Sequence, residues 1–334
     1  MRVLSCFSKI NELKKLALEG VNEVYCAVDG LQSFGDGGKI KGTDYLRKSA
    51  DLAHSLGLKI FLAFNGAVSV NMDFRQVRND IGRDLFMDNV SAALRAGADS
   101  FIVSNIAVME ALRRRFGKDI DMHLSSVQPC FNAAAAGYFI EGFGVSRIIL
   151  PNLLSPREAC RIIALCRKKG VETEIFDYRF FGCAYINGKC LLHDAQYYTF
   201  REDRPSRGGD MCRAGVTEVY DGKTIEARAL CGIKEDSELL AALKKRVFEA
   251  VDCRGPYPFY DFSSFFDFFA LGIDVLKYGT RSDPTPVKIA KARALRTVVD
   301  TARKYKEAYP IAEAKARFCR DMEKWDYKKE IPAR

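Results

Sequence analysis

The stretch Gly57-Leu58-Lys59-Ile60-Phe61-Leu62-Ala63-Phe64 contains the unit from which the fold of this chain can be predicted. The segment before it, Asp44 to Leu56, has the spacing of a helix, and glycine suits the left-handed position just past a helix end. The apolar run after the glycine is typical of a buried strand. The sequence therefore predicts a helix, a tight turn and a strand in succession.

The same unit recurs along the chain, with a glycine before each of seven short apolar runs, and the opening run Arg2–Ser5 is added to them. Together with Lys59–Phe64, the predicted strands are Arg2–Ser5, Glu23–Cys26, Ser100–Val103, Asp121–Leu124, Arg147–Leu150, Glu172–Phe176 and Asp274–Tyr278. The predicted helices are Ile10–Glu19, Asp44–Leu56, Phe74–Arg95, Ala107–Phe116, Asn132–Gly142, Pro156–Lys168, Ser263–Leu271 and Pro286–Tyr309. Eight alternations of strand and helix predict an α/β protein with a TIM-like (β/α)8 barrel.

A doubly wound open sheet is the alternative fold. Such a sheet normally has a glycine-rich phosphate loop after its first strand. Cys6-Phe7-Ser8 follows the first predicted strand here and is not such a loop. The barrel is therefore preferred.

The connection after Glu172–Phe176 interrupts the regular alternation, because residues 177–262 stand where a few residues would suffice. Long insertions in compact domains are usually functional or disordered, and one that follows a barrel strand begins at the face where barrel enzymes have their active sites. We expect one barrel over residues 1–309, including this insertion, and a C-terminal helical tail over 310–334.

The insertion holds a group of cysteines in turn-rich sequence. Cys183 and Cys190 flank Asn187-Gly188, a strong turn signal that brings the two cysteines together. Cys212 and Cys253 are each followed by an arginine, which would offset the negative charge of a thiolate cluster. The spacing is compatible with a soft metal or a four-cysteine cluster, and equally with scattered structural cysteines.

Further cysteines lie outside the insertion. Cys26, Cys130, Cys160, Cys166 and Cys319 fall on strand or helix patterns and are expected to be packing residues.

No apolar run approaches the length of a membrane span, and the N-terminus lacks the pattern of a signal peptide, so we expect a cytoplasmic protein. The net charge of +9 is compatible with an ordinary basic surface, an anionic substrate or RNA.

Several segments together resemble the collagenase-like peptidase family U32. The most specific is the series Glu174-Ile175-Phe176, Gly182-Cys183, Asn187-Gly188-Lys189-Cys190, Arg207-Gly208 and Cys212-Arg213. Leu124-Ser125-Ser126-Val127-Gln128 with Asn132, Arg147-Ile148-Ile149-Leu150-Pro151 with Glu158, and Leu276-Lys277-Tyr278-Gly279-Thr280-Arg281 are similar to further family motifs. The resemblance covers roughly residues 1 to 305.

The resemblance implies a barrel with a [4Fe–4S] cluster. Carried over by position, the ligands are Cys183, Cys190, Cys212 and Cys253, with Cys231 as the rival for the fourth place. In length the chain is similar to the oxygen-independent hydroxylase proteins of ubiquinone biosynthesis. Longer relatives hydroxylate tRNA or ribosomal RNA, with prephenate implicated as the hydroxyl source.

Four residues are candidates for binding a substrate or an anionic co-substrate. Lys277 and Arg281 end the last predicted strand, a region that often binds anions in such barrels, and Arg179 is a further candidate. Asn65 ends a strand and resembles a family asparagine, although a turn residue would also explain it. A basic mouth would suit a dicarboxylate such as prephenate.

Other residues differ from the family or have two interpretations. Asn105 stands where the family commonly has aspartate, and Tyr278 where it has glutamate; both are expected at the barrel mouth. His123, within a predicted strand, is expected to be a satisfied core residue more often than a proton donor. The aromatic run Phe262–Phe269 is expected to pack the barrel, with a base-stacking surface or a partner interface as alternatives.

The sequence and the family resemblance are compatible with three functions. The first is an oxygen-independent hydroxylase, alone or as a subunit with a homologous or redox partner, acting on a small aromatic or quinone precursor or on an RNA base. The second is a collagenase-like peptidase, although the sequence contains no His-Glu-x-x-His helix and no glycine-framed serine. The third is a non-catalytic RNA-binding protein, which only the positive net charge favours.

Overall fold

A computed structural model gives the architecture of the chain. The structure describes residues 1–31, 33, 39–65, 80–128, 130–152, 154–177, 262–281 and 283–325. Side chains are described within these ranges, except for residues 80–85.

Eight parallel strands form a closed barrel. In the order in which they pair, the strands are β1 (Arg2–Cys6), β2 (Glu23–Val28), β4 (Lys59–Phe64), β5 (Ser100–Val103), β6 (Met122–Leu124), β7 (Arg147–Ile149), β8 (Glu172–Phe176) and β9 (Val275–Lys277). β1 pairs with both β2 and β9, so the sheet has no free edge within the barrel. This closure confirms the predicted TIM-like fold and excludes the open doubly wound sheet.

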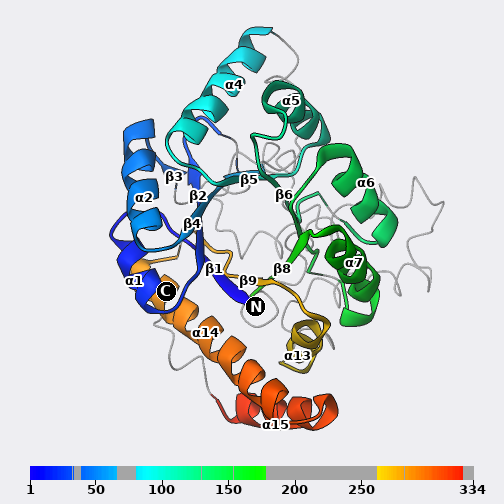
Figure 1. Ribbon diagram of the computed structural model, residues 1–334. Coiled ribbons are helices and arrows are strands. Elements are labelled where there is room, and N and C mark those ends of the chain that lie inside the picture. The colour runs from blue at the N-terminus through cyan, green and yellow to red at the C-terminus, as the bar shows by residue number, and fades with distance from the viewer. Residues whose placement is uncertain are drawn as a thin grey trace, which may run out of the picture.

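Helices surround the barrel (Figure 1). They are α1 (Glu12–Leu18), α2 (Thr43–Ser55), α4 (Asp80–Arg95), α5 (Ile106–Phe116), α6 (Ala133–Phe143), α7 (Pro156–Lys169), α13 (Phe262–Leu271), α14 (Thr285–Ala308) and α15 (Ile311–Lys324). The predicted helix from Phe74 begins at Asp80 as described, because residues 66–79 lie outside the described residues.

A two-residue strand, β3 (Lys39–Ile40), pairs with β2 outside the barrel and was not predicted. Its residues do not form a run long enough for the period-two pattern of a strand to appear. In the part of the chain that the structure describes, no helix is long and apolar enough to cross a membrane.

Local sequence explains how the helices end and begin. Gly144 and Gly170 adopt the left-handed conformation directly after α6 and α7, as the predicted turns require. Helix α7 begins with a capping box, in which the Ser155 hydroxyl accepts from the Glu158 amide and the Glu158 carboxylate accepts from the Ser155 amide. These caps set where α6 and α7 end and where α7 begins.

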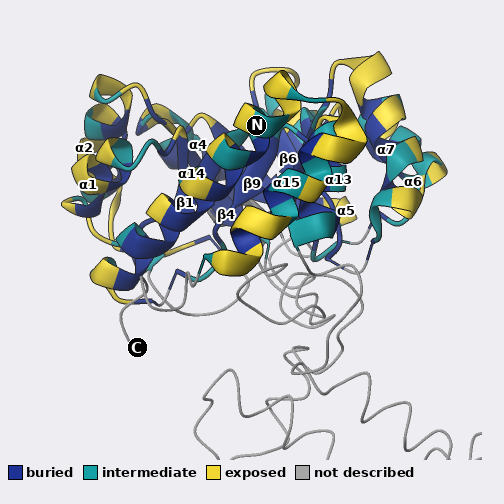
Figure 2. Cartoon of the chain, turned by 90° about the horizontal axis from the view of Figure 1, so that it is seen from below, coloured by how far each residue is buried: buried dark blue, intermediate teal, exposed yellow. Residues whose placement is uncertain are grey.

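The hydrophobic core lies between the barrel and the inward faces of the helices, and the exposed residues lie on the outer faces (Figure 2). Helix α13 is the most aromatic part of it. Phe265, Phe266 and Phe268 are fully buried, and the ring centroids of Phe266 and Phe318 of α15 lie 5.3 Å apart. The aromatic run therefore packs the barrel against the last helix, as expected.

Candidate active site at the carboxyl-terminal mouth of the barrel

Polar side chains lie where the strands end at the carboxyl-terminal mouth. Asn65 directly follows β4, and its Nδ2 donates to the hydroxyl of Ser125, which follows β6, over 3.0 Å. The amide of Val127 also donates to this hydroxyl, at 3.3 Å. Active sites of TIM barrels are built from residues at these strand ends. Asn65 and Ser125 are thus brought together from two strands, as a binding site requires.

Lys277, the last residue of β9, lies inside the barrel with 3% of its surface exposed. Its Nζ is 3.1 Å from Oε1 of Glu174 on β8. The same nitrogen lies 4.3 Å from the ring centroid of Tyr25 and 5.0 Å from that of Phe176. Burial lowers the pKa of Lys277, and the carboxylate of Glu174 opposes this shift. The amine is therefore held in one position by a carboxylate and two aromatic rings.

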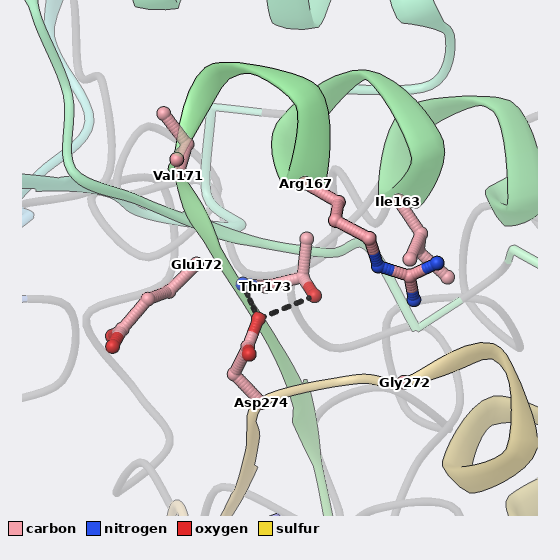
Figure 3. A pocket seen from close by; sticks show the side chains of 8 residues that line it. Ile163, Arg167, Val171, Glu172, Thr173, Gly272 and Asp274 are labelled. Carbon is pink, nitrogen blue, oxygen red and sulfur yellow. Dashed lines mark hydrogen bonds between the residues drawn. The ribbon is translucent and has the colours of Figure 1, made fainter.

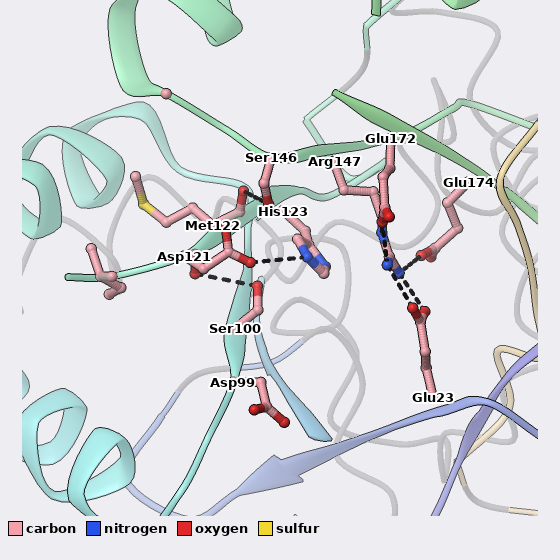
Figure 4. A network of polar contacts seen from close by, with 12 residues as sticks. Glu23, Asp99, Ser100, Asp121, Met122, His123, Ser146, Arg147, Glu172 and Glu174 are labelled. Atoms are coloured by element: carbon pink, nitrogen blue, oxygen red, sulfur yellow. Dashed lines mark hydrogen bonds and ion pairs between the residues drawn. The ribbon is translucent and has the colours of Figure 1, made fainter. Parts of the chain in front are cut away.

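A network of charges extends from Glu174 into the barrel (Figure 4). Nη1 of Arg147, on β7, lies 3.0 Å from Oε2 of Glu174 and 2.8 Å from Oε2 of Glu23 on β2. Because β2 and β7 are not neighbours in the sheet, this contact crosses the barrel interior. Burial would lower the pKa of Arg147, but Glu174 and Glu23 more than offset it, and the pKa is raised. The guanidinium stays charged inside the barrel.

Asp177 was missed by the sequence analysis. It directly follows β8, is fully buried, and accepts from the Gly279 amide through Oδ1 at 3.3 Å. Within the described residues its Oδ2 has no hydrogen-bond partner. Burial raises the pKa of Asp177 to about 7, although Lys291 opposes the shift. An acidic residue directly after a barrel strand was the signal available in the sequence.

Arg281 follows β9 and is 8% exposed. Burial raises the pKa of the Cys26 thiol, and the positive charge of Arg281 opposes this shift. Burial also lowers the pKa of Lys277, to which Arg281 adds a small effect of the same sign. The charge of Arg281 therefore reaches both Cys26 and Lys277.

Two positions that differ from the family have structural partners. The Asn105 side chain caps α5 by accepting from the Val108 amide at 3.2 Å. The Tyr278 hydroxyl donates to Asp283, and its ring centroid lies 4.9 Å from Nζ of Lys291 on α14. Tyr278 therefore packs behind the strand against α14 and does not line the mouth, contrary to expectation.

The family motifs also contain helix caps. Asn132 caps α6 by accepting from the Ala135 amide at 2.8 Å, as Glu158 and Ser155 cap α7. These polar residues explain how the helices that follow β6 and β7 begin. They do not provide chemistry at the mouth.

A match to a protein-family profile shows which family the chain belongs to. The profile of Peptidase family U32 matches residues 8–329, which is nearly the whole length. The chain belongs to peptidase family U32. Membership agrees with the resemblance of the cysteine segment and of the motifs at the ends of β6, β7 and β9.

The solved structures that are similar to this U32 chain have low sequence identity to it. The U32 peptidase Mk0906 has 16% identity and a TM-score of 0.46, with 62% of this chain and 81% of that chain covered. The aldo-keto reductase AKR11C1 from Bacillus halodurans, holo form, has 11% identity and a TM-score of 0.39, with 97% and 87% covered. The YdjI aldolase from Escherichia coli K12 has 11% identity and a TM-score of 0.35, with 76% and 91% covered.

The predicted cluster ligands of this U32 chain lie outside the described residues. They are Cys183, Cys190, Cys212 and Cys253, together with the rival Cys231 and the candidate anion-binding residue Arg179. Among the described residues, no group of three histidine, cysteine or acidic side chains is arranged to hold a metal ion.

None of the described cysteines takes part in a disulfide bond. Cys26, Cys130 and Cys166 are buried, as predicted, whereas Cys160 and Cys319 are half-buried. Burial raises the pKa of Cys130 to about 12 and that of Cys166 to about 11. A metal ligand has to be a thiolate, so these cysteines are suited to packing and not to coordination.

Proposed function

We propose that this chain is an iron–sulfur protein of the U32 family that acts as an oxygen-independent hydroxylase or as a subunit of one. The cysteine segment from Cys183 to Cys212, within the family match, is the observation that carries the proposal. The cluster is a [4Fe–4S] cluster held by Cys183, Cys190, Cys212 and Cys253.

The donor set has suitable chemistry, because four thiolates are the usual ligands of such a cluster. When bound, the cluster would exchange single electrons beside the substrate. The raised pKa values of Cys6 and Cys130, about 12 for each because of burial, support the choice of ligands from the insertion. These buried thiols are protonated at neutral pH and do not compete for iron.

The mouth binds an anionic co-substrate, and prephenate is the proposed hydroxyl donor. Lys277 and Arg281 supply positive charge, Asn65 supplies a hydrogen-bonding amide, and Arg179 adds a further guanidinium from the insertion. Since Glu174 already neutralises much of the Lys277 charge at 3.1 Å, a carboxylate gains most from Arg281. Lys277 then fixes the position of the ligand beside Tyr25.

The hydroxyl acceptor is a small aromatic or quinone precursor, or an RNA base. The net charge of +9 supports an anionic acceptor but is also typical of an ordinary basic surface. A homologous or redox protein is the proposed partner, because a cluster needs a source or sink of electrons.

A collagenase-like peptidase is the second candidate, and the family name favours it. The described histidines give it no support. His54 and His123 each have an aspartate partner, Asp99 at 3.0 Å and Asp121 at 3.3 Å, and not a serine or a cysteine. A nucleophile needs such a base within hydrogen-bond reach.

Anaerobic purification tests the cluster. The full chain is expected to be brown and to contain about four irons and four sulfides per chain, as a [4Fe–4S] cluster requires. Cys183→Ala should abolish the colour, whereas Cys160→Ala, at a half-buried helix position, should keep it. A colourless, iron-free wild-type protein, or unchanged iron in the Cys183 variant, would contradict the proposal.

Isotope transfer tests the reaction. Prephenate labelled with oxygen-18 in its ring hydroxyl is supplied to an anaerobic culture, and quinone precursors and hydrolysed RNA are analysed by mass spectrometry. Labelled hydroxyl in one of these fractions identifies the acceptor class, and its loss in a deletion strain links it to this chain. Casein or collagen cleavage that survives loss of the cluster would favour the peptidase.

A further inference from the structure

Helix α7 presents three cations in a line on its outer face. Arg157, Arg161 and Lys168 are exposed, and their separations of four and seven residues are close to one and two turns of a helix. At 1.5 Å per residue this basic stripe is roughly 16 Å long. Within the part of the chain that the structure describes, none of the three has an ion pair. The basic stripe is therefore a row of positive charge without compensating carboxylates.

The neighbouring cations of α7 do have partners. Nζ of Lys169 lies 3.0 Å from Oε1 of Glu141 on α6. Arg167 lines a hollow of about 220 Å³ together with residues of the strands (Figure 3), and it donates to the carbonyl of Leu271. The positions of Arg167 and Lys169 are thus explained by contacts within the protein, which the basic stripe lacks.

Exposed arginines of the last two helices show the more usual arrangement. Arg293 of α14 pairs with Glu19 at 2.6 Å, and Arg317 of α15 pairs with Glu313 at 2.8 Å. A carboxylate at this distance offsets the positive charge at the surface. These two arginines therefore provide a matched contrast for the arginines of the basic stripe.

Helix stability explains only part of the basic stripe. The C-terminal end of a helix favours a cation, so Lys168 in the last turn of α7 is well placed. Arg157 lies in the first turn, where the helix dipole disfavours a cation. Arg161 follows it by four residues, a spacing at which like charges destabilise a helix. Two arginines that weaken their own helix indicate a role in binding.

An exposed aromatic ring lies on the neighbouring helix α6. Tyr138 is 53% exposed. Its ring packs edge to face against Phe139 and Phe143, with centroids 5.4 and 5.6 Å away. These contacts hold the tyrosine ring in place and leave about half of the residue open to a ligand.

Contacts between α6 and α7 place Tyr138 level with the basic stripe. A Cβ on Gly137 of α6 would lie 3.9 Å from Cδ2 of Leu165 of α7. The ion pair between the two helices joins residues 28 positions apart, the same separation as that of Gly137 and Leu165. The helices therefore run side by side in the same direction (Figure 1). Since Leu165 lies within the length of the basic stripe, Tyr138 is level with it.

Cations in line beside an exposed aromatic ring suit a single-stranded nucleic acid, because the cations contact phosphates and the ring stacks on a base. We infer that the face formed by Tyr138 and the basic stripe binds a single-stranded nucleic acid. The basic stripe holds the phosphates, and Tyr138 stacks on one base. The face lies on the outer wall of the barrel, and the inference does not depend on the proposed hydroxylation.

An acidic protein is the other macromolecule with complementary charge. A stable protein interface covers about 800 Å² on each partner and has an apolar core. The other exposed residues of α6 are Ala134, Glu141 and Gly142, which offer no large apolar side chain. Stacking on a base needs only one aromatic ring. The composition of the face therefore favours a nucleic acid.

Fluorescence anisotropy of end-labelled probes tests the inference on the full chain, purified anaerobically. Oligouridylate and oligothymidylate of about 12 nucleotides distinguish RNA from DNA, and a polyglutamate peptide probes the acidic-protein alternative. At least one oligonucleotide should bind in a saturable manner. The logarithm of its association constant should fall with the logarithm of the salt concentration with a slope of about −2, because each phosphate contact of a single strand contributes about 0.7.

Variants test each part of the face. Arg157→Gln/Arg161→Gln should weaken binding at low salt on the order of tenfold and reduce the slope to about −0.7, the value for one remaining contact. Tyr138→Ala should weaken binding roughly fivefold or more, the lower end for one stacked base. Tyr138→Phe keeps the ring and should bind as the wild type does.

The control removes the same charge elsewhere on the surface. Arg293→Gln/Arg317→Gln lowers the net charge equally but leaves the basic stripe intact. Because salt screens charges beyond a Debye length, this variant should change the affinity by less than about twofold. Thermal denaturation of all variants confirms that they are folded.

Two results would overturn the inference. The first is no saturable binding of either oligonucleotide up to roughly 100 μM protein, the upper end for non-specific nucleic-acid binding. The second is an equal loss of affinity in the variants of the basic stripe and in the control. Polyglutamate binding without oligonucleotide binding would also overturn it, and would assign the face to an acidic protein. Iron content and hydroxyl transfer are measured separately, so the proposed function can fail without changing these results.

Discussion

Nζ of Lys277 and Oε1 of Glu174 lie 3.1 Å apart inside the barrel, on neighbouring strands and almost without solvent contact. Breaking a buried pair leaves an uncompensated charge, at a cost of about 3 to 5 kcal/mol. Because Arg147 also contacts Glu174, Lys277→Met should lower the free energy of unfolding by about 3 kcal/mol, the lower end of that range. Urea denaturation measures this change.

An exposed pair serves as the control for Lys277. Lys169 and Glu141 lie 3.0 Å apart, with side chains 41% and 66% exposed, so Lys169→Met should cost less than about 1 kcal/mol. The double variant Glu174→Gln/Lys277→Met should be more stable than the Lys277 variant alone. Equal losses for Lys277→Met and Lys169→Met would show that the interior pair does not stabilise the barrel.

The raised pKa of Asp177 leads us to expect that the stability of the protein depends on pH. Its pKa is raised from 3.8 to about 7, so the folded protein holds a proton that the unfolded chain has lost between these values. Stability from this group is therefore lost as the pH rises from about 4 to about 7. The Asp177→Asn variant has no carboxyl group to titrate, so it does not lose stability in this way. The difference in free energy of unfolding between the variant and the wild type should therefore be more favourable to the variant at pH 8 than at pH 4, by up to about 4 kcal/mol at 1.36 kcal/mol per pKa unit.

Denaturation of both proteins across this pH range measures the difference. Asp51→Asn, at an exposed position of α2, is the matched control and should show no such increase. A constant difference between Asp177→Asn and wild type from pH 4 to pH 8 would mean that the carboxyl group of Asp177 titrates normally.

Thiol labelling distinguishes the classes of cysteine. Burial raises the pKa of Cys6 and Cys130 to about 12, so at pH 7.5 roughly one molecule in 10⁴ or fewer carries the reactive thiolate at each site. Iodoacetamide should leave both unlabelled in the folded protein and should label the half-buried Cys160 faster than either. Mass spectrometry of digests, with a urea-unfolded control, gives the rates. Equal rates for Cys130 and Cys160 in the folded protein would contradict the prediction.

Alanine variants at two helix–strand turns, Gly57 and Gly97, distinguish the cost of backbone strain from the cost of steric crowding. Gly57 and Gly97 have φ angles of 72° and 95°, and a side chain in left-handed backbone costs about 1 to 2 kcal/mol. A Cβ on Gly97 would also lie 3.0 Å from Cβ of Ala50, whereas one on Gly57 would have open space. Gly97→Ala should therefore lower the melting temperature more than Gly57→Ala. The opposite order would show that the neighbouring helix yields to the new methyl group.

The sequence was sufficient to predict the barrel because each helix–strand turn left a local signal. Gly144 and Gly170 adopt the expected left-handed conformation, and the strand Glu172–Phe176 has the predicted bounds. Strand β3 left no such signal, because Lys39 and Ile40 are only two residues.

The candidate site was less accessible to sequence reasoning, because long-range contacts decide it. Glu172 and Glu174 stand two residues apart in the strand Glu172–Phe176, a spacing that places both on one face. Their partner Arg147 is separated by 25 and 27 residues in the sequence, so only the pairing of β7 with β8 reveals the contact. The direction of the Tyr278 side chain could not be predicted from the sequence either, because it depends on packing against α14.

The double pairing of β1 has a consequence for synthesis of the protein. β1 pairs with β9 as well as β2, so the first strand to leave the ribosome waits for the last before the ring can close. Roughly 100 residues separate β8 from β9, which at about 5–20 residues per second is a delay of roughly 5–20 s. During that interval β1 and β8 are both open edges, and a nascent chain in this state should depend on chaperones until Val275–Lys277 emerges.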